Sequence, residues 1–521
     1  MSKRKLAKNA GSMSLAVFIS RILGLVRDIV MTSFFGTSYV ADAFQVAYQI
    51  PNLLRKLFGE GALSAAFVPI YNEVGIKKGR KYQVNFAINV LSLLSLALLI
   101  LSGLGILLAP LIVRVLAPGF GEQTYLLTLK LTRIMFPYLF LIGLSSTLIA
   151  ILNSHDYFFL PGLTSAFLNI GMVGSLALYI LLKDAQTVEQ QVTVWSYGVV
   201  IGGVLQTIVN FPLLKRLGYR FRLNFSLAAG GLKAVWQRFL PGVWGLAIRQ
   251  VNLAVDLILA STLATGSIAA LNYGNRLMQL PLGIFGITAG VVALPAFSRY
   301  FAQKKWETLA DELRFSIISL SLIMLPVTAI LAGLGKDIIR VIFMRGAFGQ
   351  HSLDMTNAAL VFYSLGLVFY GLNRLIIPIY YANKDTKTPV KISAFIVVIN
   401  ISLNIIFMKF LQHAGLALAT SVSALIQFGV LLMFLRKKIP QIRIPSMKKS
   451  IAKILLISLF IFVFLSLANY YYLAASFWQA LLKIAILGIM SLLILVAGIN
   501  ILKIEHGDII IKRIWQKILR K

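Results

Sequence analysis

The chain has 521 residues, of which 59% are hydrophobic and 13% charged, and its formal net charge is +33. This composition excludes a soluble globular domain and indicates a polytopic membrane protein. The absence of cysteine excludes disulfides and thiolate metal sites, and four scattered histidines argue against a histidine metal centre. Cytoplasmic loops explain most of the positive charge, and because no basic soluble domain is present we expect no nucleic-acid partner.

Apolar stretches recur along the chain, and each is long enough to cross a bilayer as a helix of about 20 residues. Residues 1–10 are basic but no small-residue cleavage site follows them, so we expect the first span to be retained. The second stretch contains Pro51, Gly59 and Gly61, which predict a kink or a break into two pieces. We expect an all-α polytopic fold of about fourteen transmembrane helices, centred within 11–34, 40–74, 83–112, 125–152, 160–183, 194–214, 239–264, 268–298, 312–334, 356–381, 390–410, 414–435, 451–473 and 479–502.

The charge of the loops predicts the orientation of these spans. The loops at 35–39, 184–192, 265–267 and 474–477 hold almost no Lys or Arg, whereas the alternate loops and both termini are basic. The positive-inside rule therefore places both termini in the cytoplasm. The loop at 336–348 is an exception, because Lys336, Arg340 and Arg345 fall on the outer side. Residues 503–521 alternate apolar and basic side chains, which predicts an amphipathic helix on the inner leaflet or a frayed basic tail.

An internal repeat divides the chain. Arg21 precedes Asp28 by seven residues, and Arg249 precedes Asp256 by the same spacing. An even number of predicted spans separates the two copies, so both enter the membrane from the same side. The repeat predicts two six-helix bundles related by a pseudo-two-fold axis along the membrane normal, with a ligand site between them. The expected divisions are a first bundle at 1–217, a second at 218–438, and two extra transmembrane helices with the basic tail at 439–521.

Charges inside the spans need a separate explanation, because a charge near the bilayer centre costs about 2.5–3.5 kcal/mol on insertion scales. Arginine stays protonated when desolvated, and its planar fork can bind phosphate through two hydrogen bonds. An inward-facing cluster of arginines would therefore suit a phosphorylated or carboxylated ligand. The alternatives are snorkelling to the headgroups, as for Lys56, and ion pairs inside the bundle, such as Arg27 with Asp42. The charges concerned are Arg21, Arg27, Asp28, Asp42, Arg55, Lys56, Glu60, Lys130, Arg133, Arg249, Asp256, Arg276 and Arg374.

A second group of polar side chains is not cationic. Asn400 and Asn404 lie one helical turn apart on one face of the eleventh span, and Thr420 lies early in the twelfth. With Asp256 they could give oxygen ligands to a small hard cation, and hydrogen bonds between helices are the alternative. The sequence contains no Walker motif, no His–carboxylate metal motif and no nucleophile-elbow serine, so we expect a transporter and not an enzyme.

Three stretches carry a resemblance to a known family. They read SRILGLVRD at 20–28, VADAFQVAYQIPNLLRKLFGEGALSAAFVPIY at 40–71 and NRLMQLPLGIFG at 275–286. They resemble the MurJ (MviN) family of bacterial lipid II flippases, in the multidrug/oligosaccharidyl-lipid/polysaccharide exporter superfamily, and the likeness covers nearly the whole chain. It implies a multi-pass protein of the bacterial inner membrane that moves lipid II, an undecaprenyl-pyrophosphate-linked disaccharide-pentapeptide, to the outer leaflet by alternating access, for peptidoglycan synthesis.

The resemblance also implies roles for particular residues. The family's functional arginines line a central cationic cavity and map onto Arg21, Arg27, Arg55 and Arg276, with Asp42 as an acidic partner and Arg374 at a further cavity position. A sodium site found in some members maps onto Asp256, Asn400, Asn404, Thr420 and the backbone carbonyl of Leu416. One family pattern has Asp at the position of Asn404, so this chain lacks a formal charge there. The last two spans resemble the pair that forms a groove for the lipid tail.

Three functions stay open at this point. The first is lipid II transport, and the second is export of another lipid-linked oligosaccharide or a drug by the same fold, for which the cavity need not be rich in arginine. The third is a membrane enzyme acting on prenyl pyrophosphates, which would need acid, base or metal ligands that this chain shows rarely. We expect a monomer among membrane lipids, with the cell-wall synthesis machinery as a candidate partner.

Overall fold

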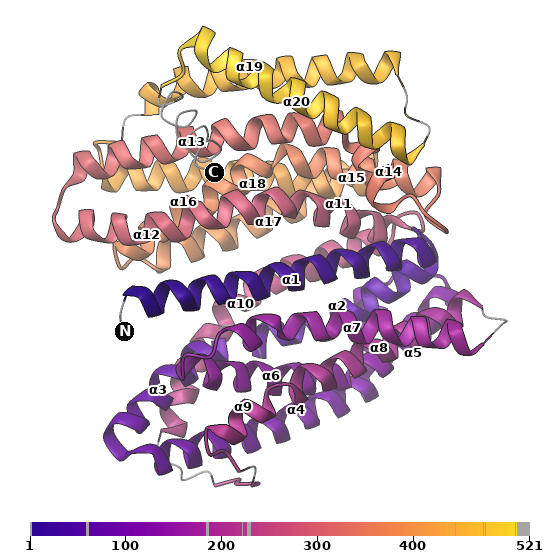
Figure 1. Cartoon of the computed structure of the whole chain (residues 1–521), viewed down its shortest axis with the longest axis vertical. Helices are drawn as coiled ribbons and strands as arrows, with labels where there is room; N and C mark the ends of the chain where they lie inside the picture. Colours follow the sequence, from indigo (N-terminus) through magenta and orange to yellow (C-terminus); the bar gives the residue numbers. More distant parts are fainter. Residues whose placement is uncertain are drawn as a thin grey trace. The chain divides into compact units, whose positions relative to one another are not determined.

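A computed structural model of the chain describes residues 3–58, 62–183, 187–220, 222–226, 231–442, 444–472, 474, 476–505 and 507. The regular elements in these ranges are helices, which confirms the predicted all-α fold (Figure 1). The chain divides into two compact units, Met1–Ile268 and Ala269–Lys521, here called unit 1 and unit 2. The bundle boundaries at 217 and 438 stay a prediction. Glu60 and the amphipathic tail after residue 507 lie outside the described residues.

Unit 1 holds the helices that precede residue 262. Apolar stretches with few breakers form them, and Pro137 at the start of α6 separates that helix from α5. Pro51 lies inside α2, whereas Gly59 and Gly61, the other residues expected to break the second stretch, lie outside the described residues. The helices are α1 (Lys3–Phe35), α2 (Tyr39–Phe58), α3 (Ala62–Lys78), α4 (Arg80–Leu116), α5 (Glu122–Met135), α6 (Pro137–Ser154), α7 (Phe159–Leu182), α8 (Val188–Ile208), α9 (Phe211–Arg216) and α10 (Leu232–Ser261).

Small residues let the helices of unit 1 approach closely. α7 packs against α8 and α1, and α10 packs against α3. Between α7 and α8 the backbones nearly touch, because a Cβ at Gly171 would lie 2.5 Å from Cα of Gly202. Helices in lipid gain nothing from the hydrophobic effect, so close van der Waals packing of this kind supplies much of their attraction. Glycine at these two positions is therefore required by the packing.

Unit 2 contains the remaining helices. α12 packs against α16, α17 against α18, and α13 against α19. The α13–α19 contact is part of an apolar cluster that also includes Leu487 and Ile499 of α20. The elements are α11 (Ser267–Pro281), the π-helical turn η1 (Leu282–Gly286), α12 (Ile287–Ala302), α13 (Trp306–Gly333), α14 (Gly335–Phe343), α15 (Gln350–Leu365), α16 (Leu367–Ala382), α17 (Lys387–Leu411), α18 (His413–Lys438), α19 (Ile444–Tyr471) and α20 (Phe477–Leu502).

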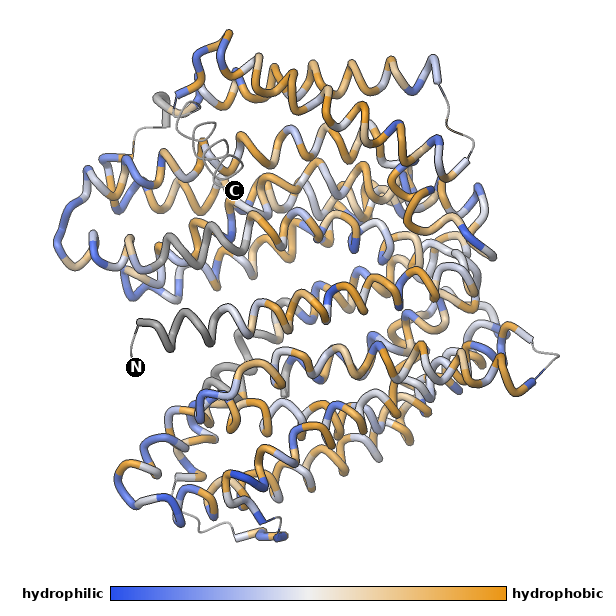
Figure 2. Tube along the Cα trace, viewed as in Figure 1, coloured by the Kyte–Doolittle hydropathy of each residue, from blue (hydrophilic) through white to orange (hydrophobic). Residues whose placement is uncertain are grey.

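The helices have the length and polarity of membrane spans. Among the described residues, 9 helices are long and apolar enough to cross a bilayer, or 10 if α15 and α16, bent by 43°, form one span. The other predicted spans coincide with α1, α2–α3, α10 and α11–α12. The count of fourteen is compatible with this result. Hydrophobic residues run along the helices and hydrophilic ones gather at their ends and turns (Figure 2). The chain is a multi-pass membrane protein.

Candidate functional site

Arg21 and Arg27 lie in the part of α1 that follows its basic first residues and is mostly apolar. Arg21 is exposed and Arg27 is half-buried. Arg27 donates to the carboxylate of Asp28 through Nε at 3.1 Å and Nη2 at 2.6 Å, and the two side chains are 13% and 12% exposed. The ion pair of Arg27 is thus with Asp28 and not with Asp42, the partner suggested from the sequence. A long arginine side chain can fold back onto the next residue of its own helix, and spacing arguments overlook such a contact.

Arg55 is held by hydrogen bonds within α2. Its Nε donates to Oδ1 of Asn52 at 2.8 Å, and Nδ2 of Asn52 donates to the carbonyl of Tyr48 at 2.8 Å. The backbone thus orients Asn52, and Asn52 orients the guanidinium. Sequence analysis missed Asn52, although its position three residues before Arg55 is the signal that could have found it.

The carboxylate of Asp42 closes a contact within unit 1. Asp42 is 3% exposed, and its Oδ2 accepts a hydrogen bond from the backbone N–H of Gly266 at 2.6 Å. Gly266 precedes the first residue of α11, where the N–H groups of the helix attract a negative charge. Gly266 has φ +91°, and a Cβ there would lie 2.3 Å from the carbonyl oxygen of Thr37. Only glycine fits this approach of the α10–α11 turn to the α1–α2 turn, and sequence analysis did not select it.

The other predicted cations are distributed over both units. Arg276 is exposed on α11 and Arg374 is half-buried on α16, both in unit 2, whereas Lys130 and Arg133 are exposed on α5 of unit 1. The side chain of Arg249 lies outside the described residues. Each unit therefore carries arginines inside predicted spans that the surrounding protein does not fully cover. An array of fixed guanidinium groups can bind an anion, and it does not by itself supply an acid–base pair.

The oxygen-bearing residues of the predicted cation site form hydrogen bonds with their neighbours. Asn404 Nδ2 donates to Asn400 Oδ1 at 3.1 Å, and the Thr420 hydroxyl donates to the carbonyl of Leu416 at 2.9 Å. Asn400 Nδ2 reaches the hydroxyl of Ser423 at 3.2 Å, a contact between α17 and α18 that the sequence did not predict. These oxygens suit a hard monovalent cation in type, but all of them are neutral. The one carboxylate of the set, Asp256, lies in unit 1 and accepts from Asn252 Nδ2 at 3.2 Å.

A polar cluster joins three helix ends of unit 1 beyond the apolar spans. The Arg80 Nη1 group lies 2.7 Å from His155 Nε2, and Arg80 Nη2 donates to the carbonyl of Leu217 at 2.8 Å. The hydroxyl of Tyr71 contacts both His155 and the hydroxyl of Tyr219. Burial, and then the charge of Arg80, lower the pKa of His155 below its usual range. The cluster ties α3, α4, α6 and the turn after α9 together, and sequence analysis did not find it.

Comparison with known proteins identifies the family. The model of the family described as lipid II flippase MurJ matches residues 31–490. A Buchnera aphidicola subsp. Baizongia pistaciae protein named "Probable lipid II flippase MurJ" is 34% identical over 427 residues, 81% of this chain and 82% of that protein. The lipid II flippase MurJ of Burkholderia cenocepacia is 32% identical over 426 residues, 81% of this chain and 82% of its own.

Solved structures agree with this result. A structure of lipid II flippase MurJ in an inward closed conformation covers 96% of this chain and 99% of its own, with a TM-score of 0.78 and 29% identity. An inward-facing multidrug resistance MATE family transporter of the MOP superfamily has the same fold at 15% identity and a TM-score of 0.61, covering 85% of this chain and 96% of its own. These are transporters, as the lack of catalytic motifs led us to expect. This chain belongs to the lipid II flippase MurJ family.

Proposed function

We propose that this protein moves lipid II from the inner to the outer leaflet of the bacterial cytoplasmic membrane. The observation that carries the proposal is the match of the family model to residues 31–490. The arginines inside the predicted spans support it, because a pyrophosphate headgroup cannot enter hydrocarbon without groups that replace its water. The polyprenyl tail can stay in the lipid while the head passes through a cationic cavity that opens to one side at a time.

The contacts of the arginines favour this role. Arg27 and Arg55 are each held by a neighbour in their own helix, Asp28 and Asn52. Such contacts fix the direction of a guanidinium before a ligand arrives, which lowers the entropy lost on binding. We propose that Arg21, Arg27, Arg55, Arg276 and Arg374 bind the pyrophosphate and that Asp42 organises the same cavity.

Several finer points belong to the same proposal. We place both termini in the cytoplasm, and we expect a monomer that contacts the cell-wall synthesis machinery. The two bundles of the repeat would be 1–217 and 218–438. In the remaining part, α19 and α20 would form a groove for the lipid tail, and sodium would bind at the residues predicted for it.

A translocation assay in cells that carry only this flippase tests the proposal. Depletion should leave lipid II synthesis intact while lipid II accumulates on the inner side. Loss of synthesis would instead indicate an enzyme, and competition by other lipid-linked sugars would indicate a different exporter. Replacing Arg21, Arg27, Arg55 or Arg276 by alanine should abolish growth while the protein stays in the membrane, and lysine should restore it in part. Normal growth of all four alanine variants would contradict the cationic-cavity mechanism.

A further inference from the structure

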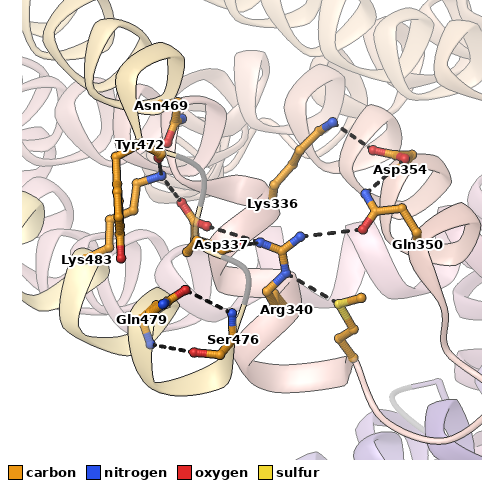
Figure 3. Close-up of polar contacts among 12 residues, drawn as sticks. Lys336, Asp337, Arg340, Gln350, Asp354, Asn469, Tyr472, Ser476, Gln479 and Lys483 are labelled. Atoms are coloured by element: carbon orange, nitrogen blue, oxygen red, sulfur yellow. Dashed lines mark hydrogen bonds and ion pairs between the residues drawn. The ribbon is translucent and has the colours of Figure 1, made fainter.

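A buried ion pair joins α20 to α14 in unit 2. Lys483 Nζ lies 3.0 Å from Asp337 Oδ2, and their side chains are 4% and 5% exposed (Figure 3). Placing two charges away from water is costly, and such a pair often stabilises a protein less than apolar side chains of the same size would. A buried ion pair favours the helix arrangement in which its two charges meet, because any other arrangement leaves a buried charge without its partner.

The surrounding contacts show that α14 holds the turn between α19 and α20. Lys483 Nζ also donates to the carbonyl of Tyr472 at 2.7 Å and lies 5.8 Å from the centre of its ring. Arg340, one turn after Asp337, lies 3.9 Å from the other carboxylate oxygen, and its Nη1 donates to the carbonyl of Ala474. Ser476 begins α20 with a capping box, so the helix starts beside this cluster (Figure 3).

The helix pair is also held at its opposite end. Arg314 of α13 lies 2.6 Å from Glu505, just after α20, and Lys453 of α19 donates to the carbonyl of Leu502. Between the two ends, α19 packs so closely on α13 that a Cβ at Gly333 would lie 2.7 Å from Cβ of Leu465. Apolar helices can slide or rotate against one another in lipid at little cost, because both faces remain in an apolar medium. Polar contacts at both ends remove that freedom.

The same region explains the loop that departs from the positive-inside pattern. Lys336 pairs with Asp354 at 2.7 Å, and Arg340 lies beside Asp337, so two of the three outer cations of 336–348 have acidic neighbours. The Lys336–Asp354 pair has side chains 56% and 47% exposed. It therefore resembles the Lys483–Asp337 pair in chemistry and distance but differs in burial. This difference makes it a matched control (Figure 3).

We infer that Asp337 and Lys483 are positioning residues that fix α19 and α20 to α14, so that the helix pair moves as one body with the rest of unit 2 during transport. The inference rests on the proposed function, in which these two helices hold the lipid tail. If the groove could shift against the rest of unit 2, the lipid tail would no longer move together with the headgroup. The ion pair sets its register.

Distances between spin labels test the inference without any transport. Because the chain has no cysteine, labels can be attached at Leu482→Cys on α20 and Ala347→Cys in the α14–α15 loop. The unmutated pair should give one narrow distance distribution in nanodiscs without substrate. Lys483→Met and Asp337→Asn should each broaden it, and so should the double variant, in which no unpaired member of the ion pair remains. Lys336→Met and Asp354→Asn should leave it narrow.

Lipid II translocation is then measured on the same variants. We expect at least a tenfold loss for Lys483→Met, Asp337→Asn and the double variant, and no loss in the Lys336 and Asp354 controls. Narrow distributions in both single variants would overturn the inference even if translocation by the unmutated protein is established. Broad distributions with normal translocation would also overturn it. If the single variants do not reach the membrane, the double variant decides, because it leaves neither partner buried as an unpaired charge: a broad distribution supports the inference and a narrow one contradicts it.

Discussion

The first two helices of unit 1 and the last two of unit 2 use charge in opposite ways. In α1 and α2, Arg27 and Arg55 each bond to a neighbour in their own helix. At α20 and just after it, Lys483 and Glu505 pair with Asp337 of α14 and Arg314 of α13. A partner in the same helix orients a side chain and leaves the helix free to move. A partner on another helix fixes the position of the helix itself.

Burial alone does not distinguish these two uses. The Arg27–Asp28 pair and the Lys483–Asp337 pair are both well covered. What differs is the separation of the partners in the sequence. Arg27 and Asp28 are adjacent, whereas Asp337 and Lys483 are far apart and belong to different helices. We therefore expect substitutions in the first pair to impair transport with little effect on stability, and substitutions in the second to change the arrangement of helices.

The largest effect is expected for Asp28→Asn. The change removes the charge that holds the Arg27 guanidinium but keeps a side chain of the same shape. We expect translocation of lipid II to fall about tenfold, equivalent to a loss of roughly 1.4 kcal/mol in transition-state positioning. The melting temperature of the purified protein should stay within about 2 °C of the unmutated value. A large fall in melting temperature with normal translocation would break the comparison, because the pair would then be structural.

A smaller effect is expected at the contact of Asp42, a charged residue of α2 whose partner lies outside its own helix. Asp42 lies near the start of α2 and reaches Gly266, so by the rule above it should fix position. Gly266→Ala combines a positive φ with a Cβ 2.3 Å from the Thr37 carbonyl, and we expect the melting temperature to fall by about 4 °C or more.

Two other glycines serve as controls for this change. Gly79 has φ +84° with nothing near its Cβ, so Gly79→Ala should show the backbone strain alone and a smaller fall. Gly349 has neither feature, and Gly349→Ala should leave the melting temperature unchanged. Equal effects at all three positions would mean that the contact with Thr37 contributes nothing.

The sequence predicted the positions of the helices but not the contacts between helices that are distant in the chain. Hydropathy located the helices. Contacts between distant segments were not predictable, because the bond from Gly266 to Asp42 and the pair of Lys483 with Asp337 each join residues far apart in the chain. A charge in an apolar stretch shows that a partner or a ligand is needed. It does not say which of the two is present.

The cluster around His155 is another set of contacts between different helices of unit 1. His155 contacts Arg80 and Tyr71, and burial and the charge of Arg80 lower its pKa. The unfolded chain, with a histidine pKa of about 6.5, therefore binds a proton more readily than the folded one, and stability should fall as the pH drops through and below that value. We expect the melting temperature to fall by about 1–2 °C more between pH 7.5 and 5.5 in the unmutated protein than in His155→Gln. If the melting temperatures of the two proteins change with pH in the same way, the cluster does not help to fix the positions of these helices.

A last effect concerns Asp256, which accepts a hydrogen bond from Asn252 one turn away in the same helix. Sodium is the ligand that we propose for this carboxylate. Sodium should raise the melting temperature of the purified protein by about 1–3 °C, because a ligand of the folded state stabilises it by mass action. Potassium should raise it less, and Asp256→Ala should abolish the difference between the two salts. An equal response of the unmutated protein to both salts would leave Asp256 as a partner of arginine or a carrier of protons, with the flippase assignment unchanged.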